Sequence, residues 1–79
     1  MNKTTLTIPS SAYKNLIIDY AYARFMAKHL GSSYWQGKAD ALMLVFNYCW
    51  GLTSVEVQES REFKQALIDV ENAHIAELP

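Results

Sequence analysis

Apolar residues recur at helical spacing along most of the chain, and few residues interrupt this pattern. Pro9, Gly31 and Gly51 divide the sequence into segments that start beside Ser or Thr residues suited to N-capping. The second and third segments also show capping-box spacing, with Ser or Thr three residues before Gln or Glu. The pattern predicts an all-α three-helix bundle, with helices at about 10–30, 33–50 and 53–78.

The predicted helix at 10–30 has apolar residues on two nearly opposite sides. Leu16 and Tyr20 lie on one side, whereas Tyr22 and Phe25 lie on the other. A helix that is apolar on two sides has to be covered on two sides. We therefore expect this helix to be packed on both faces.

The predicted helix at 33–50 is apolar nearly all round. Asp40 and Asn47 lie together in a narrow polar strip, and Cys49 lies on the opposite side. A helix with so little polar surface is usually buried. We therefore expect 33–50 to be the central helix of the bundle, and Cys49 to be a small buried hydrophobe rather than a reactive thiol.

Apolar surface is in surplus for so short a chain. Of the 79 residues, 51% are apolar and only 19% are charged, with a single cysteine and therefore no internal disulfide. A chain of this size buries only about 60% of the surface that it exposes when unfolded. We therefore expect a homodimer that also binds a protein partner. The residues expected at these interfaces are Ile18, Tyr22, Phe25, Met26, Tyr34, Trp35, Val57, Ile68 and Ile75.

Within this set, Tyr34 and Trp35 are adjacent at the start of a predicted helix. Two neighbouring residues on a helix cannot both point inward. At least one of these two rings is therefore expected to be exposed or covered by another chain.

The first nine residues follow a different pattern, in which Thr, Leu and Ile alternate at a period of two before Pro9. Residues 1–9 are predicted to form an extended N-terminal arm or a short strand, and both alternatives stay open. Residues 10–79 are predicted to form a single helical domain.

A short strand, a proline, a helix and a second helix after a Gly-Ser-Ser turn form an order that resembles the ribbon-helix-helix family of dimeric DNA-binding repressors and antitoxins. The resemblance is carried by residues 4–9, the helix that follows and the turn at 31–33. In that family, outward ribbon side chains enter the major groove of DNA, which implies contacts by Lys3, Thr5 and Thr7. The first helix is several residues longer here than is usual in the family.

Charge is distributed unevenly along the chain. Residues 1–52 carry a net charge of +3 and residues 53–79 carry −4, which gives −1 in total. A weakly basic half followed by an acidic helix is typical of antitoxins whose tail covers a partner. A nucleic-acid-binding domain is usually much more basic, so nucleic-acid binding is only the alternative interpretation.

Residues with catalytic or metal-binding chemistry are few. His29 and His74 are far apart, and the pair Glu71 and His74 would need a second copy and further carboxylates to form a metal site. We expect no enzyme activity, no cofactor and no metal. The longest nearly uncharged stretch, 41–55, is shorter than the roughly 20 residues of a membrane span, and the N-terminus lacks a secretory h-region, so we expect a cytoplasmic protein without membrane contact.

The sequence thus predicts a small non-enzymatic protein-binding or regulatory module that acts through a helical, aromatic-rich surface. Short chains of this kind are frequent among accessory proteins of mobile elements, including phage inhibitors and antitoxins. The alternative is a DNA-binding repressor or antitoxin of the ribbon-helix-helix type, with an acidic C-terminal helix that binds a partner.

Overall fold

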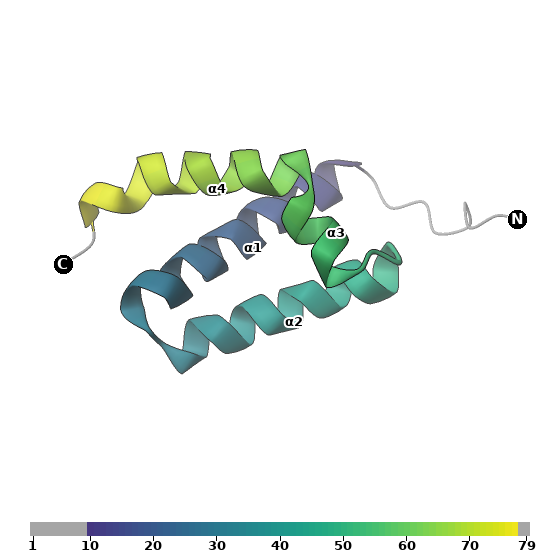
Figure 1. Cartoon of the computed structure of the whole chain (residues 1–79), viewed down its shortest axis with the longest axis horizontal. Helices are drawn as coiled ribbons and strands as arrows, with labels where there is room; N and C mark the ends of the chain where they lie inside the picture. The colour runs from purple at the N-terminus through teal and green to yellow at the C-terminus, as the bar shows by residue number, and fades with distance from the viewer. Residues whose placement is uncertain (1–9, 78–79) are drawn as a thin grey trace, which may run out of the picture.

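The structure of the protein, a computed structural model, describes residues 10–77 and is built from helices alone over that range (Figure 1). The expected all-α class is confirmed. The predicted arm or strand at 1–9 lies outside the described residues. The elements in chain order are α1 (Ser10–Leu30), α2 (Ser33–Cys49), α3 (Ser54–Glu59), α4 (Arg61–His74) and the short 3-10 helix η2 (Ile75–Glu77).

The helix in the centre of the molecule is α1. It packs against α2 on one side and against α4 on the other, whereas no Cα atom of α2 lies within 8 Å of one in α4 (Figure 1). The expectation that 10–30 is covered on two faces is confirmed. The expectation that 33–50 is the central helix is wrong, because α2 packs against only one long helix.

The core is organised around Tyr20, whose side chain on α1 is only 2% exposed. Its ring lies 5.9 Å from that of Phe46 on α2 and 5.3 Å from that of Phe63 on α4. The Tyr20 hydroxyl accepts hydrogen bonds from Arg24 Nη1 at 2.9 Å and from Gln58 Nε2 at 3.1 Å. The Tyr20 side chain therefore packs α1 against both α2 and α4, and its hydroxyl is hydrogen-bonded although it is buried.

The helix boundaries mostly follow the signals in the sequence. Gly31 and Gly51 adopt left-handed φ values of +60° and +66° just beyond α1 and α2, a conformation that glycine adopts without a Cβ penalty. At the start of α3, Thr53 and Glu56 form the expected capping box. At the start of α2, the N-cap is Ser32, whose side chain accepts from the Tyr34 amide, rather than the neighbouring serine.

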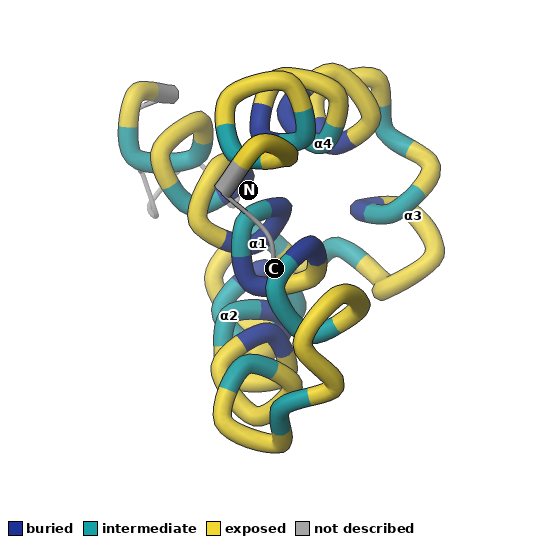
Figure 2. The backbone as a smooth tube through the Cα atoms, turned by 90° about the vertical axis from the view of Figure 1, so that its left-hand side faces the viewer, coloured by how far each residue is buried: buried dark blue, intermediate teal, exposed yellow. Residues whose placement is uncertain are grey.

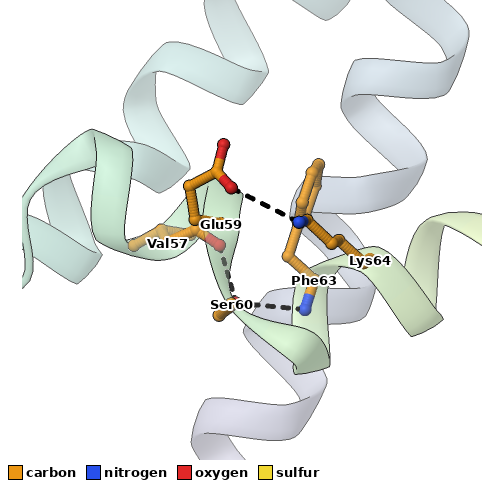
Figure 3. A network of polar contacts seen from close by, with 5 residues as sticks. All are labelled: Val57, Glu59, Ser60, Phe63 and Lys64. Carbon is orange, nitrogen blue, oxygen red and sulfur yellow. Dashed lines mark hydrogen bonds and ion pairs between the residues drawn. The ribbon is translucent and has the colours of Figure 1, made fainter.

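The single helix expected at 53–78 is two helices with a corner at Ser60 (Figure 3). Ser60 is extended, with ψ of 149°. Its hydroxyl donates to the Val57 carbonyl at 2.6 Å and accepts from the Phe63 amide at 3.2 Å, so it ends α3 and caps α4 at once. The corner allows Val57 and Phe63 both to be buried, which a straight helix would not.

Replacing Phe46 with alanine should destabilise the fold by about 3 to 5 kcal/mol, because the ring is fully buried between α1 and α2. Urea denaturation followed by circular dichroism measures this free energy of unfolding. As a control, Val55→Ala removes a side chain that is 68% exposed and should change it by no more than about 0.5 kcal/mol. Equal effects from the two variants would contradict this core.

Replacing Ser60 with alanine should lower the free energy of unfolding by about 0.5 to 2 kcal/mol, because α4 loses its N-cap and α3 loses a terminal hydrogen bond. Ser60→Thr keeps a hydroxyl that both donates and accepts, and should retain most of the stability. The same denaturation experiment compares the two. A Ser60→Ala variant as stable as the parent would show that the corner does not depend on this cap.

Candidate interaction surface

The outward side of α2 forms an exposed apolar stripe. The inward side of this helix buries Ala39, Met43 and Phe46 against α1. On the outward side, Tyr34 is 64% exposed, and exposed residues recur along the helix (Figure 2). Five of these exposed residues form what we call the outer stripe of α2: Tyr34, Gly37, Ala41, Leu44 and Tyr48.

Helix geometry places the members of the outer stripe on one line. Their separations alternate between three and four residues, the spacing with which helices pack against each other. At about 100° per residue they fall within about 80° of one another, on the side opposite the core. Leu44 and Tyr48 are 53% and 80% exposed, so most of their apolar area faces water.

The outer stripe contains no charged residue, and the charges beside it are engaged within α2. Lys38 Nζ lies 5.8 Å from the ring centroids of both Tyr34 and Trp35. On the opposite margin, Asp40 accepts a hydrogen bond from Gln36 at 3.0 Å. The surface is therefore neutral and apolar along its length, with one cation and one anion at its borders.

Burying this stripe would release a substantial free energy. Full burial of a large apolar side chain contributes about 1.5 to 3 kcal/mol, and tyrosine is favoured at the energetic centres of protein interfaces. The outer stripe has two tyrosines and a leucine that are each more than half exposed. Its composition and geometry suit a helical protein partner.

The interface residues expected from the sequence differ in how far they are exposed to solvent. Phe25 is 1% exposed and Val57 is fully buried, so both belong to the core of this chain and cannot contact another. This corrects the expectation: the side of α1 assigned to a second chain is covered by α4, and the corner at Ser60 turns α3 inward. The residues that are half-buried are Tyr22, Met26 and Trp35, and those that are exposed are Ile18, Tyr34, Ile68 and Ile75.

The structure brings three of these residues together in an aromatic cluster. The ring of Trp35 lies 5.1 Å from that of Tyr34 and 5.2 Å from that of Tyr22. Tyr22 in turn lies 5.0 Å from His74 near the end of α4. As expected, one ring of the adjacent pair is exposed: Tyr34 points to solvent, while Trp35 ties α2 to α1.

Sequence reasoning missed four members of the outer stripe: Gly37, Ala41, Leu44 and Tyr48. The sequence did contain a signal, because a helix that is apolar all round and has a three-four spacing on two sides offers two packing faces. The expectation that 33–50 is the central helix assigns both of its apolar faces to the core. In the structure, α1 covers only one of these two faces.

Two grooves lie beside α4. The larger has a volume of about 360 Å³ and is lined by Ile18 together with Lys14, Arg61, Glu62 and Asp69. Its two cations and two anions balance, so it does not select a ligand of either charge. The smaller, of about 260 Å³, likewise combines Arg24 and Lys28 with Glu71 and apolar side chains.

Chemically reactive groups are sparse in the described part of the chain. Among residues 10–77, no group of three or more His, Cys, Asp or Glu side chains could hold a metal ion. Cys49 is exposed at the end of α2, which corrects the expectation that it is a buried hydrophobe. No helix in this region is long and apolar enough to cross a membrane.

Lys3, Thr5 and Thr7, which the ribbon-helix-helix resemblance implies as DNA contacts, lie outside the described residues. Comparison of the chain with protein-family models, with curated proteins and with solved structures finds no match.

The pKa of the Tyr13 hydroxyl is raised by its surroundings in the folded chain. Burial raises the pKa of its hydroxyl above the usual value of 10.0, the carboxylate of Glu62 raises it further, and a hydrogen bond with Ser60 opposes both. The folded state therefore favours the neutral phenol. Tyr13 contributes full stability below its ordinary pKa, and this contribution is lost as pH rises toward the raised folded value.

We expect the free energy of unfolding to fall as pH rises past the ordinary tyrosine pKa of 10.0, and Tyr13→Phe to reduce that fall. Denaturation at several pH values measures the slope. Glu62→Gln removes the nearby negative charge and should make the slope shallower, though less than Tyr13→Phe does. Identical slopes in the parent and Tyr13→Phe would contradict this assignment.

Proposed function

We propose that this protein is a small non-enzymatic protein-binding module that acts as a homodimer, and that the outer stripe of α2 is its dimer surface. The observation that carries the proposal is a helix with two apolar faces of which only one is covered. Apolar helices of this kind are normally buried on all sides. A second protein chain is the natural cover for the exposed face.

A second copy of the chain fits this surface because the outer stripe is uncharged. A basic or acidic partner would gain no ion pairs along it, whereas an identical stripe supplies an equally neutral apolar face. Each copy would bury Leu44 and Tyr48 against the other. The same pairing relieves the apolar surplus of a chain in which 51% of the residues are apolar and 19% are charged.

Other apolar residues stay available for a further protein partner in such a dimer. Ile18 on α1 and Ile68 on α4 are 50% and 51% exposed, and neither belongs to α2, the helix that carries the outer stripe. We assign the regulatory partner to these residues. The exposed thiol of Cys49 suits a reducing, cytoplasmic setting, where such thiols stay reduced.

Replacing Leu44 with glutamate should convert the dimer to a monomer, because it would bury an unpaired carboxylate in the interface. Light scattering coupled to size-exclusion chromatography gives the mass at concentrations from about 1 to 100 µM, a range in which a specific dimer of micromolar affinity dissociates. The affinity should fall at least about tenfold. The variant should stay folded, since Leu44 is 53% exposed within its own chain.

The matched control is Ile68→Glu, which makes the same kind of change at a residue that is 51% exposed on α4. It should leave the dimer intact. A parent chain that is monomeric at 100 µM, or a dimer that Ile68→Glu disrupts and Leu44→Glu does not, would overturn the proposal.

A further inference from the structure

Gly37 has no role that its own chain explains. It lies inside α2 with a φ in the ordinary helical range, since the glycines with positive φ are Gly31 and Gly51. Apart from its two neighbours and the adjacent backbone of α2, a Cβ built on Gly37 would meet no atom within 4 Å. Glycine inside a helix is nevertheless unfavourable relative to alanine. The helix thus contains a destabilising residue that neither its backbone conformation nor packing among residues 10–77 requires.

The position of Gly37 indicates what its missing side chain makes room for. It belongs to the outer stripe, where the next residue of the stripe, Ala41, is also small. The other half of the same stripe carries the large side chains of Leu44 and Tyr48. Gly37 and Ala41 therefore form a notch in the stripe between the large side chains of Tyr34 on one side and of Leu44 and Tyr48 on the other. Small residues at such a place allow another backbone or a large side chain to approach closely.

We infer that a second copy of this chain docks antiparallel along α2, with Tyr48 of each copy seated over Gly37 of the other. This inference rests on the proposed dimer and specifies its geometry. The same register places Leu44 against Ala41 of the second copy. Leu44 and Tyr48 of each copy then meet small residues of the other, which is how well-packed helix interfaces interdigitate.

A parallel arrangement fits the stripe less well. It would set Gly37 against Gly37 and Tyr48 against Tyr48, which leaves a void at one end and crowding at the other. The antiparallel pair is also isologous, because the contact of Tyr48 with Gly37 occurs twice about one two-fold axis. Gly37 is accordingly the residue that determines specificity for self-recognition.

The charges beside the stripe are compatible with the antiparallel register. Lys38 of one copy lies next to Val45 of the other, and Asp40 lies next to Asn47. No like charges face each other, so neither margin opposes the pairing. The hydrogen bond of Asp40 with Gln36 and the contact of Lys38 with Tyr34 can persist in the dimer.

Filling the notch tests this geometry. Gly37→Leu should fold at least as well as the parent, because the added side chain enters open space and leucine favours helix. Its dimer affinity, measured by analytical ultracentrifugation, should fall at least tenfold. The matched control is Gln36→Leu, one residue away and outside the outer stripe, which should dimerise like the parent.

A double variant shows whether Gly37 and Tyr48 face each other. Tyr48→Ala alone should weaken the dimer, but Tyr48→Ala combined with Gly37→Leu should dimerise more tightly than Gly37→Leu alone, because the notch and the large side chain have exchanged places. A Gly37→Leu chain that dimerises like the parent would overturn the register. In that case disruption of the dimer by Leu44→Glu would still support the proposed function. A parent chain that is monomeric would contradict both the proposed function and the antiparallel register.

Cys49, the only cysteine, reports the direction of the two helices. It is exposed at the C-terminal end of α2, so a nitroxide label can be attached there without disturbing the core. Antiparallel helices in the proposed register place the two labelled residues about 20 Å apart along the axis, from a rise of about 1.5 Å per residue. Electron spin-echo distance measurement should find this separation. Labels in close contact would show a parallel dimer and overturn the inference.

Discussion

The burial of Tyr20 at the middle of α1 is the contact on which the arrangement of the three long helices depends. Its ring contacts Phe46 from one neighbouring helix and Phe63 from the other. Its hydroxyl is held by Arg24 and Gln58, and no buried side-chain polar atom of the described residues lacks a partner. A large side chain that is apolar along its ring and satisfied at its tip can therefore serve two packing faces at once.

Placing α1 at the centre determines what happens to α2. A core of this size has room for one helix that is covered on both sides, and small residues such as Ala21 and Ala23, which are fully buried, let its neighbours approach closely. The strongly apolar α2 then occupies a flank, where one of its faces contacts none of the other helices described between residues 10 and 77. The exposed outer stripe is thus a direct consequence of which helix took the central position.

The sequence indicated the local features of the fold better than its spatial order. Gly31, Gly51 and the Thr53 capping box mark helix ends because they satisfy backbone requirements that act over a few residues. Which helix is central depends on contacts between distant segments, and periodicity gives the apolar faces of a helix without saying what covers them. Phe25 was assigned to a partner for this reason, although α1 has its second helix in the same chain.

The corner at Ser60 was harder to foresee. The stretch around it has good helix formers and an amphipathic pattern that continues on either side, and a single serine inside such a pattern does not usually end a helix. What decides the break is the gain from burying both Val57 and Phe63 in the one core. That gain exists only once α1 and α2 are in place, so no local signal could contain it.

Gly37 shows how a residue that is unfavourable for folding can still be informative about association. A helix-stabilising substitution there would meet no steric obstacle in the isolated chain, and stabilising changes of this kind are generally easy to reach. In the proposed dimer, the cost of this glycine to the helix would be offset by the closer approach of the second chain. The same reasoning links the two unusual properties of α2, its uncovered apolar face and its interior glycine, to one cause.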